Sequence, residues 1–337
     1  MAHTLESIAK LAGVSRGTVS RVINGQPGVR EEVRKKVLEV IREHQYQPNM
    51  QARGLAGGKT ENIGVVVFGL TPSFLSHHIF YEVIQGIQEH VASRAYDLLL
   101  FADRRPYDMD YWRMIADKRK IDGLIVMGED IQDEYLQYYY DKKLPFVLVG
   151  KRLASDIPLH CVTSDYSDGV NKAVTHLIAG GKKRILYISG YSGTYHESKR
   201  YEGYCDAHRQ AGLPADPQLI VAGYAEEQRA YEVIRQLVQD GRTFDAIFAA
   251  NDIMALGVVR ALQERGLRVP EDIAVVGYDD IAAARYANPP LSTVRQDKSG
   301  LGEAAARMLL GRLAGELDPS QSHDIYIPNE LIVRSSS

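Results

Sequence analysis

Residues 4–25 read TLESIAKLAGVSRGTVSRVING, and this stretch predicts two short helices joined by a tight turn. The first helix follows Thr4, whose hydroxyl suits an N-cap, and stops at Gly13, which accepts the left-handed backbone of a helix end. Ser15 can cap a second helix over residues 16–23. On that helix the polar positions Arg16, Gly17, Ser20 and Arg21 are free to face outward. Two helices joined in this way form the geometry with which many proteins read DNA.

A third amphipathic helix is expected after a break at residues 24–28. Its inward face consists of Val33, Val37, Val40 and Ile41, and Tyr46-Gln47-Pro48 closes it. The three helices predict a small all-α head. By geometry alone two interpretations stay open, because three-helix domains that only pack contain the same turn.

The charge of the chain is unevenly distributed. The formal net charge is -3, which by itself does not favour a nucleic-acid partner. Residues 1–60, however, contain 10 Lys and Arg against 5 Asp and Glu, so the remaining residues contain 30 against 38. A basic head on an acidic body is typical of a regulator whose head meets phosphates and whose body does not.

The rest of the chain alternates short apolar runs with amphipathic stretches, which predicts parallel α/β structure. One set of expected strands covers residues 63–68, 97–101, 123–127 and 146–149. A second set covers 184–189, 220–222, 246–249 and 273–277, with helices over 169–179, 200–211, 227–240 and 254–265. Because the cycle restarts, we expect two lobes with a ligand site between them, at the carboxyl ends of the strands.

Polar side chains stand at several of these expected strand ends. Asp165 follows an apolar pair, Arg200 is expected to begin a helix, and Asn251 and Asp279 follow two strands of the second set. Carboxylates, an amide and a guanidinium together suit a hydroxyl-rich ligand, because each hydroxyl both donates and accepts. Three further carboxylates are explained as well by helix capping and are left out of the expected site: Asp168, Asp252 and Asp280.

Literal strings then connect the chain with a known family. Those of the head are Ile8-Ala9-Lys10-Leu11-Ala12-Gly13-Val14-Ser15, Thr18-Val19-Ser20-Arg21-Val22-Ile23-Asn24-Gly25 and Tyr46-Gln47-Pro48-Asn49. Those of the body include Ala250-Asn251-Asp252, Val275-Val276-Gly277-Tyr278-Asp279-Asp280 and Pro289-Pro290-Leu291-Ser292-Thr293. Over essentially its whole length the chain resembles the LacI/GalR family of bacterial transcriptional repressors. The resemblance implies an operator-binding head and a core like that of periplasmic binding proteins.

The resemblance also implies a set of DNA contacts. Arg16, Gly17 and Arg21 take positions that read base edges in the major groove, and neighbouring hydroxyls suit phosphate oxygens. The implied contacts are Thr4, Ser15, Arg16, Gly17, Thr18, Ser20, Arg21, Asn24, Asn49, Ala52, Leu55 and Ala56. Gly17 departs from the side chain usual at its position, so the operator sequence stays open.

A hinge segment is expected between the head and the body. Its glycines make it a poor helix by itself, and a plain linker explains its composition equally well. The resemblance implies that it folds on the operator and that Leu55 wedges into the minor groove.

For the body, the resemblance implies effector contacts. Arg200, Asn251 and Asp279 match such contacts, and Tyr224 matches an aromatic position that stacks on the ligand. A looser alignment adds Phe80, and Asp165 completes the expected site. The effector is expected to be a sugar or a sugar derivative, while the sign of its effect on DNA binding stays open.

The expected architecture is an all-α helix-turn-helix head followed by a two-lobed α/β core with parallel sheets. The head covers residues 1–48, the hinge 49–60 and the core 61–337. Within the core, the N-lobe is expected to cover 61–163 and 293–322, and the C-lobe 164–290 and 323–334. The chain is expected to bind a pseudo-palindromic operator as a homodimer, and helical spacing makes Tyr81, Ile84 and Ile87 candidates for the dimer interface or for the core.

Several other classes of protein are disfavoured. No apolar run approaches the length of a membrane helix, and the first residues are unlike a signal peptide, so we expect a cytoplasmic protein. The two cysteines, Cys161 and Cys205, have no metal-ligand spacing, and neither a metal nor another cofactor is expected. A transport protein would share the two lobes but not the basic head. An enzyme would need a catalytic constellation, which is missing beside Asp279-Asp280 and Glu129-Asp130.

Overall fold

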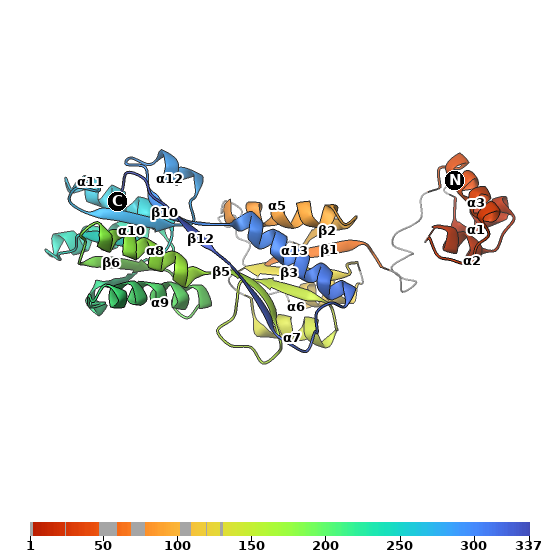
Figure 1. Cartoon of the computed structure of the whole chain (residues 1–337), viewed down its shortest axis with the longest axis horizontal. Helices are drawn as coiled ribbons and strands as arrows, with labels where there is room; N and C mark the ends of the chain where they lie inside the picture. The colour runs from red at the N-terminus through yellow and green to blue at the C-terminus, as the bar shows by residue number, and fades with distance from the viewer. Residues whose placement is uncertain are drawn as a thin grey trace. The chain divides into compact units, whose positions relative to one another are not determined.

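The computed structural model describes residues 3–23, 25–46, 59–68, 78–101, 109–118, 120–128 and 131–337. Backbone contacts separate a head, which ends at Glu61, from a core that begins at Asn62. Figure 1 shows the helices and strands of both parts, which are described separately below.

The head consists of three helices, α1 (Leu5–Ala12), α2 (Arg16–Ile23) and α3 (Glu31–Glu43). Thr4 caps α1 through a reciprocal pair of hydrogen bonds with Ser7, and Gly13 ends it at a φ of 66°. The side-chain oxygen of Ser15 accepts a hydrogen bond from the Thr18 amide at 3.1 Å, so the second expected cap is also confirmed. The helices pack on a shared apolar core, which consists of Ile8, Ala9, Ala12, Val19, Val22, Val37 and Tyr46.

Leu11 is an apolar residue of α1 that the packing leaves 48% exposed. The apolar face of a helix in a three-helix head covers only part of its circumference, and Leu11 lies at the margin of that face.

The first lobe of the core contains a six-stranded parallel sheet in the order β11-β5-β4-β3-β1-β2. Its strands are β1 (Asn62–Phe68), β2 (Asp97–Phe101), β3 (Gly123–Gly128), β4 (Phe146–Val149), β5 (His160–Ser164) and β11 (His323–Ile327). Helices α5 (His78–Ala92) and α13 (Lys298–Ala314) lie side by side on one face. Helices α6 (Met109–Asp117) and α7 (Asp133–Asp141) cover the other. The four central strands β1, β3, β4 and β5 are therefore buried on both faces, as in most parallel sheets, whereas the edge strands β2 and β11 are partly exposed.

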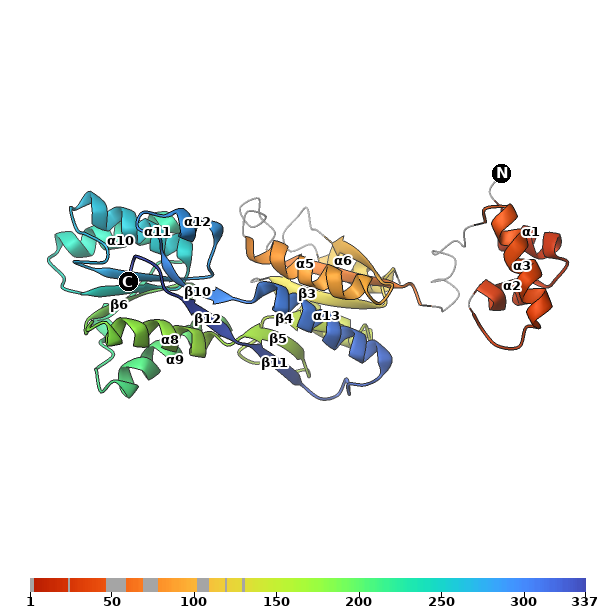
Figure 2. The same cartoon turned by 45° about the horizontal axis from the view of Figure 1, so that its top comes forward.

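The second lobe contains a six-stranded sheet in the order β12-β10-β9-β8-β6-β7, in which only β12 runs antiparallel, to β10. Its strands are β6 (Ile185–Ser189), β7 (Ile220–Ala222), β8 (Ala246–Ala249), β9 (Ala274–Tyr278), β10 (Ser292–Gln296) and β12 (Asn329–Ile332). Its main helices are α8 (Tyr166–Ala179), α9 (Tyr195–Gln210), α10 (Glu227–Gln239), α11 (Asp252–Glu264) and the short α12 (Ala282–Tyr286). Figure 2 shows α8 and α9 on one face of this sheet and α10 and α11 on the other.

Two of the expected lobe boundaries are wrong by one strand. Strand β10 pairs with β9 in the second sheet, although residues from 293 on were assigned to the first lobe. Strand β11 pairs with β5 in the first sheet, although residues from 323 on were assigned to the second. The chain therefore changes lobe three times, at residues 164–166, 296–298 and 327–329. Which sheet a strand joins leaves no mark in its local apolar pattern, so the sequence could not place these crossings.

One further expectation about helices needs correction, and the two interpretations left open for residues 81, 84 and 87 can be compared with the structure. Helix α9 begins at Tyr195, so Arg200 lies inside it and not at its start. On α5, Ile87 is fully buried against the sheet, and Ile84 packs on the same core. Of the three candidates for a dimer interface only Tyr81, which is 72% exposed, remains available. Among the described residues, no helix is both long and apolar enough to cross a membrane.

A buried histidine in the first sheet makes the fold sensitive to acid. His160 in β5 is 1% exposed, and its Nδ1 atom has no hydrogen-bond partner. Burial, with help from the positive charges of Arg312 and His323, lowers the pKa of His160 to about 4. The unfolded chain therefore takes up a proton at this residue between pH 6.5 and 4, whereas the folded chain does not. Stability is fully present above pH 6.5 and falls as the pH approaches 4, by on the order of 3 kcal/mol.

We expect His160→Gln to remove this part of the acid sensitivity. Urea unfolding of both proteins at pH 7.5 and pH 5 measures it, and the wild type should lose more stability than the variant. His196, whose pKa burial lowers to about 3, is present in both proteins, so the difference isolates His160. If the wild type and His160→Gln lost equal stability between pH 7.5 and pH 5, this part of the acid sensitivity would not come from His160.

Candidate DNA-binding and effector-binding sites

The second helix of the head presents the side chains expected to read bases. Arg16, Gly17 and Arg21 are exposed, whereas Val19 and Val22 on the opposite side of α2 are buried. A Cβ atom at Gly17 would lie 3.7 Å from the Ser15 hydroxyl, so this position has room for a side chain that the sequence omits. Helix α2 therefore exposes the guanidinium groups of Arg16 and Arg21 and, at Gly17, a stretch of backbone without a side chain.

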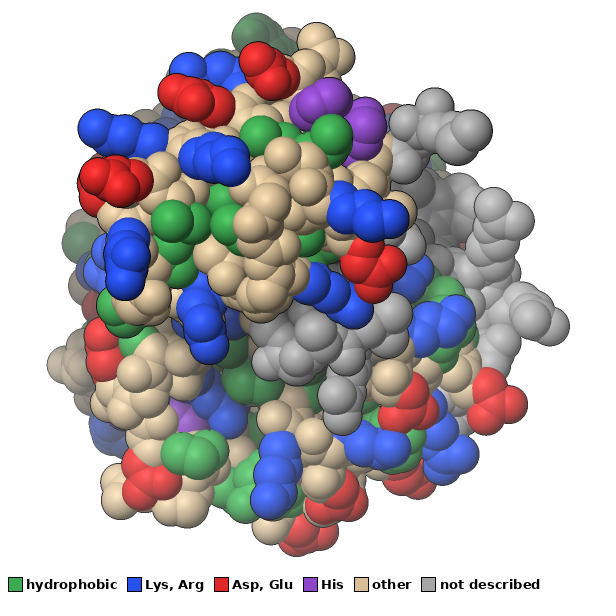
Figure 3. Space-filling view, turned by 90° about the vertical axis from the view of Figure 1, so that its right-hand side faces the viewer, with side chains coloured by type: hydrophobic (Ala, Val, Ile, Leu, Met, Phe, Trp, Pro, Cys, Tyr) green, Lys and Arg blue, Asp and Glu red, His purple; other side chains and the backbone are tan. Residues whose placement is uncertain are grey.

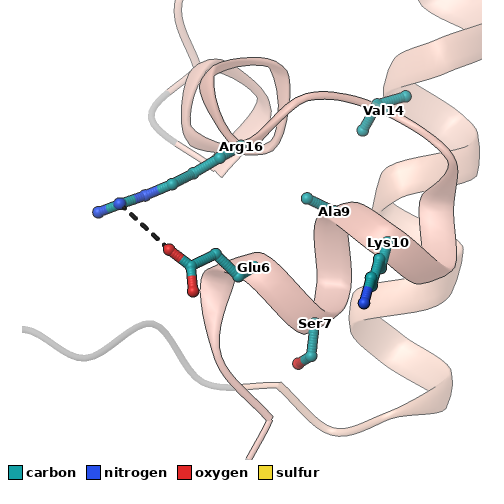
Figure 4. Close-up of a pocket in the computed structure, with 6 residues that line it drawn as sticks. All are labelled: Glu6, Ser7, Ala9, Lys10, Val14 and Arg16. Carbon is teal, nitrogen blue, oxygen red and sulfur yellow. Dashed lines mark hydrogen bonds and ion pairs between the residues drawn. The ribbon is translucent and has the colours of Figure 1, made fainter.

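Arg16 has a partner within the head. Its Nη1 atom lies 3.4 Å from Oε1 of Glu6, and the two side chains are 71% and 74% exposed. The pair lies at a surface hollow lined by Glu6, Ser7, Ala9, Lys10, Val14 and Arg16, shown in Figure 4. An exposed ion pair contributes only about 0–1 kcal/mol, so the pairing with Glu6 holds the Arg16 side chain only weakly.

The hydroxyl groups assigned to phosphates also stabilise the head itself. Thr4 and Ser15 cap the two helices, and the hydroxyl groups of Ser15 and Thr18 lie 2.9 Å apart. Ser20 is half-buried on α2. Figure 3 shows Lys and Arg side chains interspersed with acidic ones on the face that it draws, rather than gathered in one patch. The remaining expected contacts lie outside the described residues: Asn24, Asn49, Ala52, Leu55 and Ala56.

In the core, three expected effector contacts follow three strands of the second sheet. Tyr224 follows β7, Asn251 follows β8 and Asp279 follows β9. The three strands run parallel, so these residues stand along one edge of the sheet. Asp279 is 7% exposed, and its Oδ1 atom accepts a hydrogen bond from Nε2 of Gln296 at 2.7 Å. The structure thus brings a carboxylate, an amide and an aromatic ring to the same edge.

Arg200 is the most deeply buried cation of this site. Its guanidinium carbon lies 4.7 Å from the ring centroid of Tyr278 and 5.0 Å from that of Tyr166, and its Nη1 atom lies 3.7 Å from Glu197. Burial alone would lower the pKa of Arg200, but Tyr278, Glu197 and Asp279 outweigh it, so the pKa is raised. The Nε atom is buried and has no hydrogen-bond partner within the part of the chain that the structure describes, which leaves one strong donor unused there.

The other expected contacts have different surroundings. Oδ1 of Asp165 accepts a hydrogen bond from the Asp168 amide at 3.2 Å and caps α8. Phe80 on α5 packs against the apolar core of the first lobe. Tyr224 is 43% exposed, and its ring centroid lies 6.0 Å from that of Tyr191. Of these three, only Tyr224 presents a largely exposed surface.

The three carboxylates that were explained by helix capping are not the helix caps of the structure. Asp165 and Asn251, which were assigned to the effector, are the caps of α8 and α11. Asp168 instead pairs with Lys172, and Asp280 with Arg295 and Arg334. Asp252, the third discounted carboxylate, is fully buried. The N-cap preference is local, but which of two nearby carboxylates turns inward depends on distant partners.

Sequence reasoning also missed residues that build the site. Tyr166 and Tyr278 enclose Arg200, and Gln296 holds Asp279 while its Oε1 atom accepts a hydrogen bond from Ser164 at 2.6 Å. Ser164 and Gln296 lie on two of the segments that cross between the lobes. Each is the last residue of its strand, at the point where the chain leaves one lobe, and this signal could be used only if the crossings were known.

Comparisons with known proteins agree with this division into head and core. Residues 4–49 match the family model described as bacterial regulatory proteins of the lacI family, and residues 174–337 match that of a periplasmic binding protein-like domain.

Relatives and solved structures extend the similarity over the whole chain. The chain is 36% identical to the HTH-type transcriptional repressor PurR of Haemophilus influenzae (strain PittEE), covering 99% of this chain and 98% of the relative. It is 31% identical to the protein of a transcriptional regulator CelR–cellobiose complex, with a TM-score of 0.75 and coverage of 99% and 100%. A Lac repressor dimer bound to operator and the anti-inducer ONPF is 26% identical, with a TM-score of 0.81 and coverage of 100% and 99%.

Proposed function

Since the chain belongs to the lacI family of bacterial regulatory proteins and is a DNA-binding transcriptional repressor, we propose that a sugar or sugar derivative controls how tightly it binds its operator. Arg16 and Arg21 read bases in the major groove, with the hydroxyl groups of Thr4, Ser15, Thr18 and Ser20 on phosphates. Asn24 and the hinge residues Asn49, Ala52, Leu55 and Ala56 complete the DNA contacts. Arg200, Asn251, Asp279 and Tyr224 bind the effector.

The observation that carries the effector proposal is the unused donor of Arg200 beside the carboxylate of Asp279. A sugar hydroxyl both donates and accepts, so it can join a carboxylate and a guanidinium at once. The exposed ring of Tyr224 offers a flat apolar surface to the carbon face of a sugar ring. A structural relative bound to cellobiose supports the same class of ligand. Phe80 and Asp165 are weaker members of this site, because one packs on the core and the other caps α8.

The effector acts by favouring one arrangement of the two lobes. Three crossing segments connect the lobes, and a ligand that binds one arrangement better shifts the population toward it. In a homodimer on a pseudo-palindromic operator, this shift changes the relation between the two heads and therefore the affinity for DNA. The solved Lac repressor dimer supports such an assembly. The protein acts in the cytoplasm, where a bacterial operator lies, and needs no catalysis or cofactor for this role.

Two binding experiments test the proposal. Selection from random duplex DNA should yield a pseudo-palindromic site, which identifies an operator for the later measurements. A thermal-shift screen of sugars, sugar phosphates and nucleobases should then yield sugars that raise the melting temperature and change operator affinity. The screen includes nucleobases as a second class of candidate effector, because the chain is also similar to repressors named PurR. If only nucleobases bound, the sugar proposal would be wrong, and turnover of a bound compound would instead indicate an enzyme.

A further inference from the structure

Two pairs of residues in the second lobe have unfavourable backbone conformations. Tyr224 and Ala225 have φ angles of 54° and 58°, and Asp279 and Asp280 have 112° and 49°. Residues with a side chain rarely adopt positive φ, and they keep it only where the surroundings hold them. Each pair contains one proposed effector contact, and the pairs follow β7 and β9 at the same edge of the sheet.

One dipeptide makes hydrogen bonds to both of these loops. Asn251 and Asp252 follow β8, which lies between β9 and β6 in the sheet. Nδ2 of Asn251 donates to the carbonyl oxygen of Ala225 at 3.4 Å. On the other side, Oδ2 of Asp252 accepts a hydrogen bond from the amide of Ile281 at 2.8 Å, immediately after the strained aspartates.

The second oxygen of Asp252 joins the loop to a neighbouring strand. Oδ1 accepts a hydrogen bond from the hydroxyl of Thr293 on β10 at 2.5 Å, and that hydroxyl accepts one from the amide of Asp280 at 3.3 Å. Asp252 and Thr293 are both fully buried. A Cβ atom at Gly277 would lie 2.2 Å from Oδ1 of Asp252, so the missing side chain on β9 makes room for the carboxyl group.

A buried carboxyl group at this place needs a reason. Among the described residues, Asp252 forms no ion pair, and burial together with the charge of Asp279 raises its pKa to about 8. An apolar side chain would fill the same space without the desolvation penalty. What it could not supply is an acceptor for the Ile281 amide, which would then be buried without a partner.

We infer that Asn251 and Asp252 form a two-sided clamp, in which Asp252 is a positioning residue that presents Asp279 to the effector and Asn251 holds the loop of Tyr224. The clamp sets the separation of the two loops, because both are fixed to consecutive residues of one helix end. This inference rests on the proposed effector site but assigns Asp252 no contact with the effector.

Four variants separate the clamp from general packing. Thr293→Val keeps the shape of a fully buried side chain and removes the hydroxyl that joins Asp252 to β10. Asp252→Ala removes both acceptor oxygens of the carboxyl group. If Asp252→Ala does not fold, Thr293→Val still tests the clamp. Asp252→Asn is the conservative rescue, since its amide can accept from Ile281 and donate to Thr293. Ser336→Ala is the matched control, because its buried hydroxyl also makes two hydrogen bonds in this sheet without touching the loops of the clamp: it accepts from the Ser292 amide at the start of β10 and donates to the Val275 carbonyl near the start of β9.

Two measurements report on these variants. Hydrogen exchange at the amides of residues 280 and 281 reports on the clamp without any effector and should speed up about tenfold in Thr293→Val and Asp252→Ala, the effect of one hydrogen bond. Every panel compound that binds the wild type should bind these two variants about tenfold more weakly or worse. Asp252→Asn and Ser336→Ala should stay close to the wild type in both measurements.

The clamp would be refuted by unchanged exchange at residues 280 and 281 in both Thr293→Val and Asp252→Ala. It would also be refuted if Ser336→Ala weakened binding as much as Thr293→Val, because general loosening would then be the cause. Failure of the proposed function looks different. In that case no panel compound binds the wild type, or Asp279→Asn binds as the wild type does, while the exchange measurement still decides whether Asp252 holds the loop.

Discussion

Replacing Arg21 by alanine is expected to abolish specific operator binding while effector binding stays intact. Arg21 is exposed on α2, between buried residues that fix the orientation of the helix. A guanidinium that binds a guanine with two hydrogen bonds contributes about 1–3 kcal/mol of discrimination. A dimer on a symmetric operator loses this contact twice, so its affinity for the operator should fall by on the order of a hundredfold or more. Titration of the selected operator by electrophoretic mobility shift measures it.

A second arginine of the head provides the control for Arg21. Arg42 in the last turn of α3 is also exposed, and Arg42→Ala removes the same charge. It should weaken operator and random DNA alike by a small factor, because a general charge carries no sequence information. If Arg21→Ala retained the operator as well as Arg42→Ala does, the assignment of α2 as the reading helix would fail.

The largest effect on effector binding is expected from Arg200. Arg200→Ala removes the buried guanidinium from between Tyr166 and Tyr278 and leaves Glu197 without its cationic partner. A hydrogen bond to a charged group contributes about 1.5–3 kcal/mol, so effector affinity should fall by about a hundredfold if more than one such bond is lost. Calorimetric titration with the compounds that bind the wild type measures the change. Operator binding without effector should persist, because the head is a separate unit.

Two variants make the result for Arg200 specific. Arg209→Ala on the same helix removes a 75% exposed side chain with a surface ion pair to Asp206, and it should leave effector affinity unchanged. Arg200→Lys keeps the charge but lacks the Nε donor and the planar fork, so most of the loss should remain. Wild-type affinity in Arg200→Ala, or an equal loss in Arg209→Ala, would contradict the proposed site.

Much of the fold could be predicted because its signals are local. The cap at Thr4, the stop at Gly13 and the apolar spacing of α2 depend on neighbours within one or two helical turns, and the structure confirms them. The eight expected strands were found for the same reason, since each is a short continuous apolar run, which most of these strands bury on both faces. Strand β5 was not predicted because its residues HCVTS are only partly apolar, although all five are buried.

The candidate site could be predicted only in part. Arg200, Asn251 and Asp279 were expected as effector contacts, and the common position of Asn251 and Asp279 at one sheet edge follows from the strand order. The bonds that fix them were not predictable. Gln296 reaches Asp279 across 17 residues, and Thr293 reaches Asp252 across 41. Such partners are chosen by packing in three dimensions, so no spacing in the sequence reveals them.

The sequence by itself determined the helix-turn-helix head, the two-lobed class of the core and the outward face of α2, because caps, helical periodicity and apolar strands are short-range properties. Only the tertiary structure decided which strands cross between the lobes, which carboxylates cap helices and which carboxyl group is buried as a clamp. Those outcomes depend on contacts between segments far apart in the chain, where the free energy of burial selects one partner among several of similar chemistry.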